Sequence, residues 1–146
     1  MRPVVLKRDI ALLLTLAVGL AAILYAACGS STSPAPPDQV KDNPSFANDI
    51  QPIFNASCAA SSCHGSSGQA GLVLTSGQSY ARLVNVDSTQ DPTRKRVLPG
   101  DATNSYLVIK IENRQTVGAR MPPSGTLSST SIQNIKNWIT RGANNN

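Results

Sequence analysis

The feature that most constrains this chain is the stretch from Cys58 to His64, which reads Cys-Ala-Ala-Ser-Ser-Cys-His. It places two thiols and an imidazole on a short piece of backbone. Covalent attachment of a c-type haem uses the signature C-x-x-C-H, whereas here four residues separate the cysteines. Because all the spacer residues are small, the spacer can bulge outward with little steric obstruction. The stretch therefore predicts a variant haem-attachment site that uses Cys58 and Cys63.

The N-terminus has the layout of a secretory signal. Basic residues precede an apolar run from Ile10 to Leu24, which is shorter than the membrane span of about 20 residues that a helix needs. Tyr25-Ala26-Ala27-Cys28 resembles a bacterial lipobox, whose cysteine is lipidated. We therefore predict a signal peptide over residues 1–27 and lipidation of Cys28. The alternative is an uncleaved single-span anchor, and in both cases the folded part is exported and tethered to a membrane.

The address within the cell envelope depends on the residues after Cys28. No Asp follows this cysteine, because the next residues are Gly29 and Ser30. This favours the outer membrane for an exported bacterial lipoprotein, at the periplasmic side of the membrane or at the cell surface. Several acyl chains on one residue are sufficient for stable anchoring, so the membrane is a predicted partner.

Residues 28–44 are rich in Ser and Pro, which predicts a disordered linker after the lipidated residue. The folded domain is then expected over residues 45–146, a normal length for one domain. It contains few aromatic side chains, and a buried haem would add core volume that these side chains lack. The formal net charge is +5, but from Cys28 onward ten basic residues face seven acidic ones. We therefore expect no nucleic-acid partner.

The two cysteines have two other possible uses. A disulfide between Cys58 and Cys63 is chemically allowed in an exported protein, but it leaves His64 and Gly65 without a role. A structural zinc site needs four ligands, and the mature chain has no second histidine and no other cysteine except Cys28. One covalently attached haem c remains the favoured interpretation, with a disulfide or a redox dithiol as the alternatives.

The axial ligands of the iron follow from counting residues. His64 is the only histidine, so two histidines from one molecule are excluded and the sixth ligand is Met, Lys, water or absent. Met1 leaves with the signal peptide, and Met121 is then the only thioether. Pro122 keeps Met121 out of a helix, in an extended segment suited to crossing a porphyrin face. We expect His64 and Met121 as the metal ligands, and the alternative is that Met121 fills a loop or the core.

The apolar spacing predicts four short helices. We expect caps at Ser45, at Ser76 or Ser79, at Asp101 or Asn104, and at Ser128 or Ser129, with Pro52 starting or kinking the first helix and Gly142 ending the last. The side chains expected on their buried faces are Phe46, Ile50, Ile53 and Phe54, then Tyr80, Leu83 and Val84, then Tyr106, Leu107, Val108 and Ile111, and finally Ile132, Ile135, Trp138 and Ile139.

Several short motifs together carry a family resemblance. They are Ile50-Gln51-Pro52-Ile53-Phe54, Cys63-His64-Gly65, Gly71-Leu72, Pro99-Gly100-Asp101, Ser105-Tyr106-Leu107, Arg120-Met121-Pro122-Pro123, Trp138-Ile139 and Gly142-Ala143. From Ser45 to Ala143 the chain resembles the small bacterial class I cytochrome c domains, and is especially similar to planctomycete-type cytochrome c domains. The resemblance implies an all-α fold of three to five short helices wrapped around one haem, with crossing terminal helices, His64 as the proximal ligand and Met121 as the distal ligand.

The function expected is electron transfer between redox partner proteins, by a carrier rather than an enzyme. A His/Met pair raises the reduction potential of the iron and leaves no open position for a substrate. The alternatives are a haem-based sensor with an open sixth position and a haem-free, disulfide-bonded lipoprotein scaffold domain. Arg120, Tyr106 and Trp138 are candidates for contacts with the haem propionates, and the basic run 94–96 is a candidate docking patch or a solvated loop.

Overall fold

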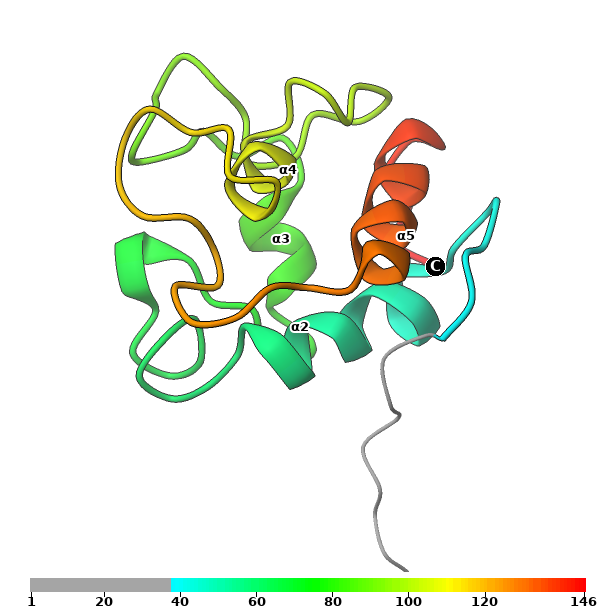
Figure 1. Cartoon of the computed structure of the whole chain (residues 1–146), viewed down its shortest axis with the longest axis horizontal. Helices are drawn as coiled ribbons and strands as arrows, with labels where there is room; N and C mark the ends of the chain where they lie inside the picture. Colours follow the sequence, from blue (N-terminus) through cyan, green and yellow to red (C-terminus); the bar gives the residue numbers. More distant parts are fainter. Residues whose placement is uncertain (1–37) are drawn as a thin grey trace, which may run out of the picture. The chain divides into compact units, whose positions relative to one another are not determined.

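The computed structural model describes residues 38–146, so the predicted signal peptide and Cys28 lie outside the described residues (Figure 1). The elements are η1 (Phe46–Ile50), α2 (Gln51–Ser57), η2 (Gln69–Gly71), α3 (Ser79–Leu83), α4 (Tyr106–Ile111) and α5 (Ser129–Thr140). Between residues 38 and 146, β structure is limited to isolated bridges. The prediction of an all-α class is therefore confirmed at this level. Across the same range, no helix has the length and apolarity to cross a membrane.

The first helical segment begins and breaks where the sequence predicts. The Ser45 hydroxyl accepts a hydrogen bond from the Asn48 amide and so caps η1. η1 is a π-helix, and it changes to an α-helix at α2, whose first turn contains Pro52. A proline is tolerated there because its missing N–H is one of the unpaired donors of a helix start. The predicted apolar face is confirmed, because all four of its side chains are buried.

The two middle helices are short and are held by packing rather than by caps. α3 covers the predicted second helix, and its Leu83 side chain is fully buried. α4 begins after Ser105, so the prediction of a cap at Asp101 or Asn104 is wrong. The Asp101 carboxylate instead accepts from the Asn104 amide in the preceding turn, at 3.0 Å. This local side-chain bond competes with helix formation and delays the start of α4.

α5 is the longest helix and packs against η1 and α4. Ser128 caps it by accepting from the Ser131 amide, as predicted. An aromatic cluster fills the contact between α5 and η1: the Phe46 ring lies 5.1 Å from Trp138 and 5.2 Å from Tyr80, centroid to centroid. Such pairs add about 0.5–1.5 kcal/mol each to the burial of their apolar area. The core therefore includes the contact between η1 and α5, and it extends to Leu83 of α3 and to Val108 and Ile111 of α4.

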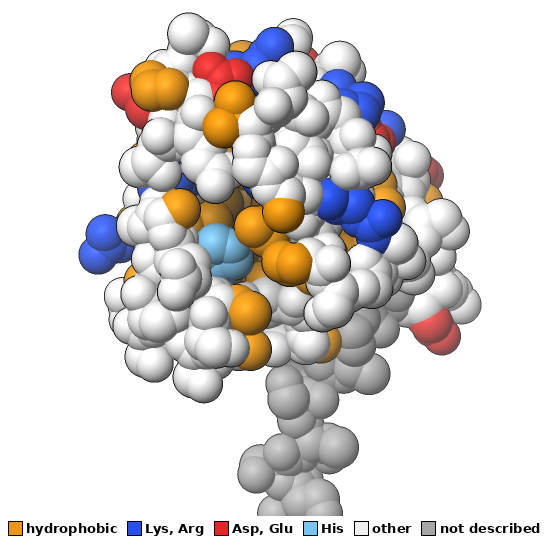
Figure 2. Space-filling model, turned by 60° about the vertical axis from the view of Figure 1, so that its left-hand side comes forward, with side chains coloured by type: hydrophobic (Ala, Val, Ile, Leu, Met, Phe, Trp, Pro, Cys, Tyr) orange, Lys and Arg blue, Asp and Glu red, His pale blue; other side chains and the backbone are white. Residues whose placement is uncertain are grey.

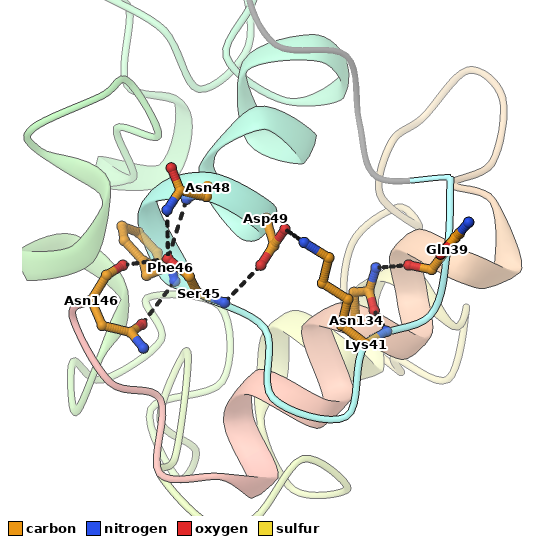
Figure 3. Close-up of polar contacts among 8 residues, drawn as sticks. All are labelled: Gln39, Lys41, Ser45, Phe46, Asn48, Asp49, Asn134 and Asn146. Carbon is orange, nitrogen blue, oxygen red and sulfur yellow. Dashed lines mark hydrogen bonds and ion pairs between the residues drawn. The ribbon is translucent and has the colours of Figure 1, made fainter.

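Residues 38–44 form an arm that packs against α5 (Figure 3). The buried side chain of Asn134 accepts from the Lys41 amide at 2.7 Å and donates to the Gln39 carbonyl oxygen at 2.9 Å. The Lys41 ammonium pairs with the buried carboxylate of Asp49 in η1, at 2.6 Å. The expected disordered linker extended to residue 44, whereas these contacts join its last residues to the folded domain.

The opposite side of the domain is built largely from loops (Figure 1). One loop region joins α2 to α3 and contains the Cys58–His64 stretch. A second loop joins α4 to α5 and contains Met121. Because loops carry few structural constraints of their own, their position depends on hydrogen bonds to the helices and to each other.

Candidate functional site

The structure brings all four residues of the predicted haem site to one cavity. Cys58, Cys63, His64 and Met121 line a cavity of about 340 Å³, within the range of small-molecule sites. The lining is mostly apolar and includes Leu72, which follows the cysteine-containing loop. Figure 2 shows the imidazole of the single histidine at the bottom of a hollow rimmed by apolar side chains. The first and the last of these four residues, which are far apart in the sequence, thus meet at one site.

The His64 ring is held in one tautomer. Its Nδ1 atom lies 3.1 Å from the carbonyl oxygen of Leu72. A carbonyl has no proton, so Nδ1 carries the hydrogen and donates it, which leaves the lone pair on Nε2. The backbone is held as well, because the His64 carbonyl accepts from the Leu74 amide at 2.6 Å. A backbone carbonyl on one ring nitrogen is the usual support for a histidine that ligates a metal through the other.

The two cysteines are free thiols and both are half-buried. Cys58 ends α2, and burial, followed by the nearby Cys63, raises the pKa of its thiol to about 12. The Cys58 thiol therefore stays protonated at neutral pH. Over residues 38–146 no group of three or more His, Cys, Asp or Glu side chains is arranged to hold a metal ion. The cysteines are thus positioned as two separate thiols at the cavity rather than as part of a cluster of metal ligands.

Met121 reaches the cavity on the loop between α4 and α5. Its amide donates to the Lys110 carbonyl oxygen at 3.0 Å, which ties the loop to the end of α4. Pro122 and Pro123 follow and also line the cavity. His64 and Met121 therefore line one cavity from two different loops.

Two cations also line the cavity, and sequence reasoning did not single out either as a cavity residue. Lys110 is 6% exposed and Arg96 is 8% exposed. The Lys110 ammonium donates to Gln90 Oε1 at 2.9 Å, and one Arg96 nitrogen donates to the Arg82 carbonyl oxygen at 2.8 Å. These acceptors are neutral, and in the described part of the chain neither cation forms an ion pair.

Burial has a clear electrostatic effect on both cations. It lowers the pKa of Lys110, and burial together with repulsion from Arg82 lowers the pKa of Arg96. A buried charge without a counter-ion is costly, and an anion in the cavity would offset that cost. The signal in the sequence was weak: Lys110 lies one helical turn after Tyr106 in an otherwise apolar run.

The three other polar candidates lie in different parts of the structure. Tyr106 lines the cavity, and its hydroxyl donates to the Val117 carbonyl oxygen at 3.3 Å. Trp138 lies in the core and donates to the Asn144 carbonyl oxygen at 2.9 Å, so it has the structural role that was the alternative for this residue. Arg120 is not among the cavity-lining residues, and it donates to the carbonyl oxygen of Gly125.

The basic run 94–96, a candidate docking patch or solvated loop, is divided between the surface and the cavity. Arg94 pairs with Asp91 at 3.1 Å, and Lys95 pairs with Asp87 at 2.6 Å. Arg96 turns inward and is buried at the cavity. Consecutive basic residues therefore do not share one surface.

Comparisons with protein-family models, with curated proteins and with solved structures gave no match for this chain. The site is therefore interpreted from its own chemistry. It combines an imidazole with a free Nε2, a thioether, two thiols and two buried cations around an apolar cavity. These groups fit a flat apolar metal cofactor that has acidic substituents and forms covalent bonds with thiols, which is the chemistry of haem c.

Proposed function

We propose that this chain is an exported, membrane-anchored monohaem c-type cytochrome that transfers electrons. In this proposal Cys58 and Cys63 attach the haem, and His64 and Met121 are its axial ligands. The domain has the fold of a class I cytochrome c, and Cys28 carries the lipid anchor. A haem held there supplies a one-electron iron couple.

The observation that supports the proposal most directly is the hydrogen bond from His64 Nδ1 to the Leu72 carbonyl oxygen. This bond favours the tautomer whose Nε2 lone pair can bind a metal. His64 is the only histidine in the chain. Both thiols line the same cavity: Cys63 directly precedes His64, and Cys58 lies six residues before it. No disulfide joins the two cysteines, so both sulfur atoms are available for bonds to a cofactor.

The cationic lining provides separate support. Arg96 and Lys110 are buried beside the cavity with neutral partners only, so they favour an occupant with negative charge. The two propionate groups of haem would supply that charge, with charge-assisted hydrogen bonds of about twice the strength of neutral ones. These two residues, rather than Arg120, are therefore proposed to face the propionates.

The residues of the site suit electron transfer better than catalysis. If Met121 binds the iron, it would leave no open position on the metal for a substrate. The lining holds no Asp or Glu and no second histidine, which are the side chains most often used as acids or bases. Lys110 and Tyr106 are already engaged, as donors to Gln90 Oε1 and to the Val117 carbonyl oxygen. His64 keeps its proton on Nδ1, where it is committed to the Leu72 carbonyl oxygen. With His64 and Met121 held by the fold, a bound iron would change charge without a change of protein ligands.

The test is expression of the full chain together with a cytochrome c maturation system. The denatured protein should stain for haem on a gel, and its intact mass should exceed by one haem that of the chain after the same signal-peptide removal and lipidation. The Cys58→Ala/Cys63→Ala double variant is the control and should lose the stain. A wild-type chain without haem would refute the proposal. A ferric spectrum that is high-spin and lacks the sulfur-to-iron charge-transfer band would instead favour a sensor with an open sixth position.

A further inference from the structure

We propose that Gly65 is a positioning residue for the two thiols, because the absence of a side chain lets the long Cys58–Cys63 spacer fold back against it. This inference rests on the function proposed above and concerns how both cysteines bond one haem. The usual signature holds its thiols two residues apart. Here the spacer is longer, so something in the fold has to bring Cys58 and Cys63 to the same cavity.

Backbone hydrogen bonds close the spacer into a compact turn. The Cys58 carbonyl oxygen accepts from the His64 amide at 3.1 Å, which joins the two ends of the motif. The Ala60 carbonyl oxygen accepts twice, from the Cys63 amide at 2.9 Å and from the Gly65 amide at 3.0 Å. The added residues therefore fold over the segment that follows the second cysteine, and Gly65 is the residue they meet.

The contact leaves no room for a side chain at Gly65. A Cβ atom there would lie 2.7 Å from the carbonyl oxygens of both Ala59 and Ala60. Real Cβ contacts are essentially never this short, and the atoms it meets are backbone, which cannot rotate aside as the end of a side chain can. Gly65 is not among the glycines with positive φ, so it is needed for space and not for its conformational freedom.

A side chain at residue 65 should impair attachment of Cys58 more than attachment of Cys63. In attachment, a thiol adds across a vinyl group of haem: a sulfur–carbon bond forms, the carbon–carbon π bond breaks, the thiol hydrogen moves to the second vinyl carbon, and no net electrons are transferred. Cys63 adjoins His64 and keeps its position relative to the imidazole when the spacer moves. Cys58 reaches the cavity through the spacer, so a displaced spacer should cost the Cys58 thioether first.

The experiment compares the wild type with Gly65→Ala and with Gly77→Ala, matured together with the haem-attachment machinery. Gly77→Ala controls for the general strain of replacing a glycine, because a φ of +80° in an exposed turn strains an alanine while nothing lies within 4 Å of its added Cβ. Free cysteines are alkylated in the denatured chains, and peptide masses then report the thioether on each cysteine. Because the chains are denatured for this measurement, a variant that folds poorly still reports its bonds.

We expect two thioethers in the wild type and in Gly77→Ala. In Gly65→Ala the ratio of doubly to singly attached chains should fall about tenfold, with the remaining bond on Cys63, since small misplacements of reacting groups reduce rates steeply. A second comparison uses the Cys58→Ala background, where total haem attachment should not respond to Gly65→Ala.

Three results would overturn the inference. An unchanged thioether ratio in Gly65→Ala would show that the spacer tolerates a side chain there. An equal loss of haem in the Cys58→Ala background would assign Gly65 a general folding role. A wild-type chain with no haem at all would refute the proposed function as well, whereas the first two results leave that function intact.

Discussion

The Met121 amide donates a hydrogen bond of 3.0 Å to the carbonyl oxygen of Lys110. This backbone bond helps to join the loop that carries the proposed distal ligand to the end of α4, where the buried Lys110 lines the same cavity. The side chains of Tyr106 and Lys110 add bonds to the Val117 carbonyl oxygen of that loop. Because the Met121–Lys110 bond joins backbone atoms, either side chain can be replaced without removing it. The effects of the two side chains on the proposed iron can therefore be measured separately.

The first prediction concerns the distal ligand. Met121→Ala should lower the reduction potential by on the order of 0.1 V, because axial ligands tune haem potentials over about 0.8 V and the thioether favours ferrous iron. The variant should also bind added imidazole or cyanide, as followed by absorption spectra. Val117→Ala is the control, since Val117 lies in the same loop, is 49% exposed and does not line the cavity. Spectra identical to the wild type would remove Met121 from the site.

The second prediction concerns the buried cations. Lys110→Gln should lower the reduction potential by roughly tens of millivolts, because removing a nearby positive charge favours ferric iron, and about 59 mV corresponds to a tenfold change for one electron. Lys95→Gln provides the control, since that lysine pairs with Asp87 and does not line the cavity. Voltammetry of both variants should show a shift in the first only. Equal shifts would mean that Lys110 acts merely through the net charge of the domain.

The third prediction concerns the arm of residues 38–44. Asn134→Ala should destabilise the domain by about 1–3 kcal/mol, because the two hydrogen bonds between a fully buried side chain and the backbone of the arm are lost. Gln133→Ala, on the exposed side of α5, should change the stability by no more than about 0.5 kcal/mol. Denaturant unfolding gives both values, and hydrogen exchange should show faster exchange at Lys41 only in the first variant. A protected Lys41 amide in Asn134→Ala would contradict this role.

The fourth prediction concerns acid stability. Glu112 accepts from Lys136 of α5 and from Arg114, each at 2.8 Å, and these partners, Lys136 first, hold the pKa of its carboxyl below the ordinary value of 4.5. The folded state therefore binds its proton more weakly than the unfolded state does. The resulting stabilisation, about 1 kcal/mol for such partly exposed pairs, is present above pH 4.5 and is lost as the pH falls below it.

Glu112→Gln tests this sign. Denaturant unfolding at pH 6 and pH 3 should give a smaller loss of stability on acidification in the variant than in the wild type. The other ion pairs remain in both proteins, so the difference between the two pH profiles isolates this carboxylate. Parallel profiles would show that the Glu112 carboxylate binds its proton equally well in the folded and unfolded states.

Local signals in the sequence predict the helices well. Ser45 and Ser128 are correct caps because a cap is a contact between a side chain and an amide three residues later. The buried faces of η1, α2 and α5 follow from spacing for the same reason. The delayed start of α4 at Tyr106 escapes this reasoning, because two local bonding patterns compete around Asp101 and only packing decides between them.

Contacts between distant residues are the part that the sequence does not predict. The inward turn of Arg96 and the burial of Lys110 depend on loops that meet only in the folded chain. Asn134 holds the Lys41 amide across 93 residues, and a Ser- and Pro-rich composition contains no sign of that bond. The four proposed haem residues are identifiable because each is a rare residue type, and their meeting at one cavity is a property of the fold.

The arm also has a mechanical consequence. Its polar contacts run to α5 and η1, and none of the arm residues that make them lines the cavity. A pull on the chain ahead of residue 38 is therefore borne by Asn134 and Asp49 before it can strain the loops that hold His64 and Met121. If the chain is anchored as proposed, lateral drag on the domain should leave the spacing between His64 and Met121 undisturbed.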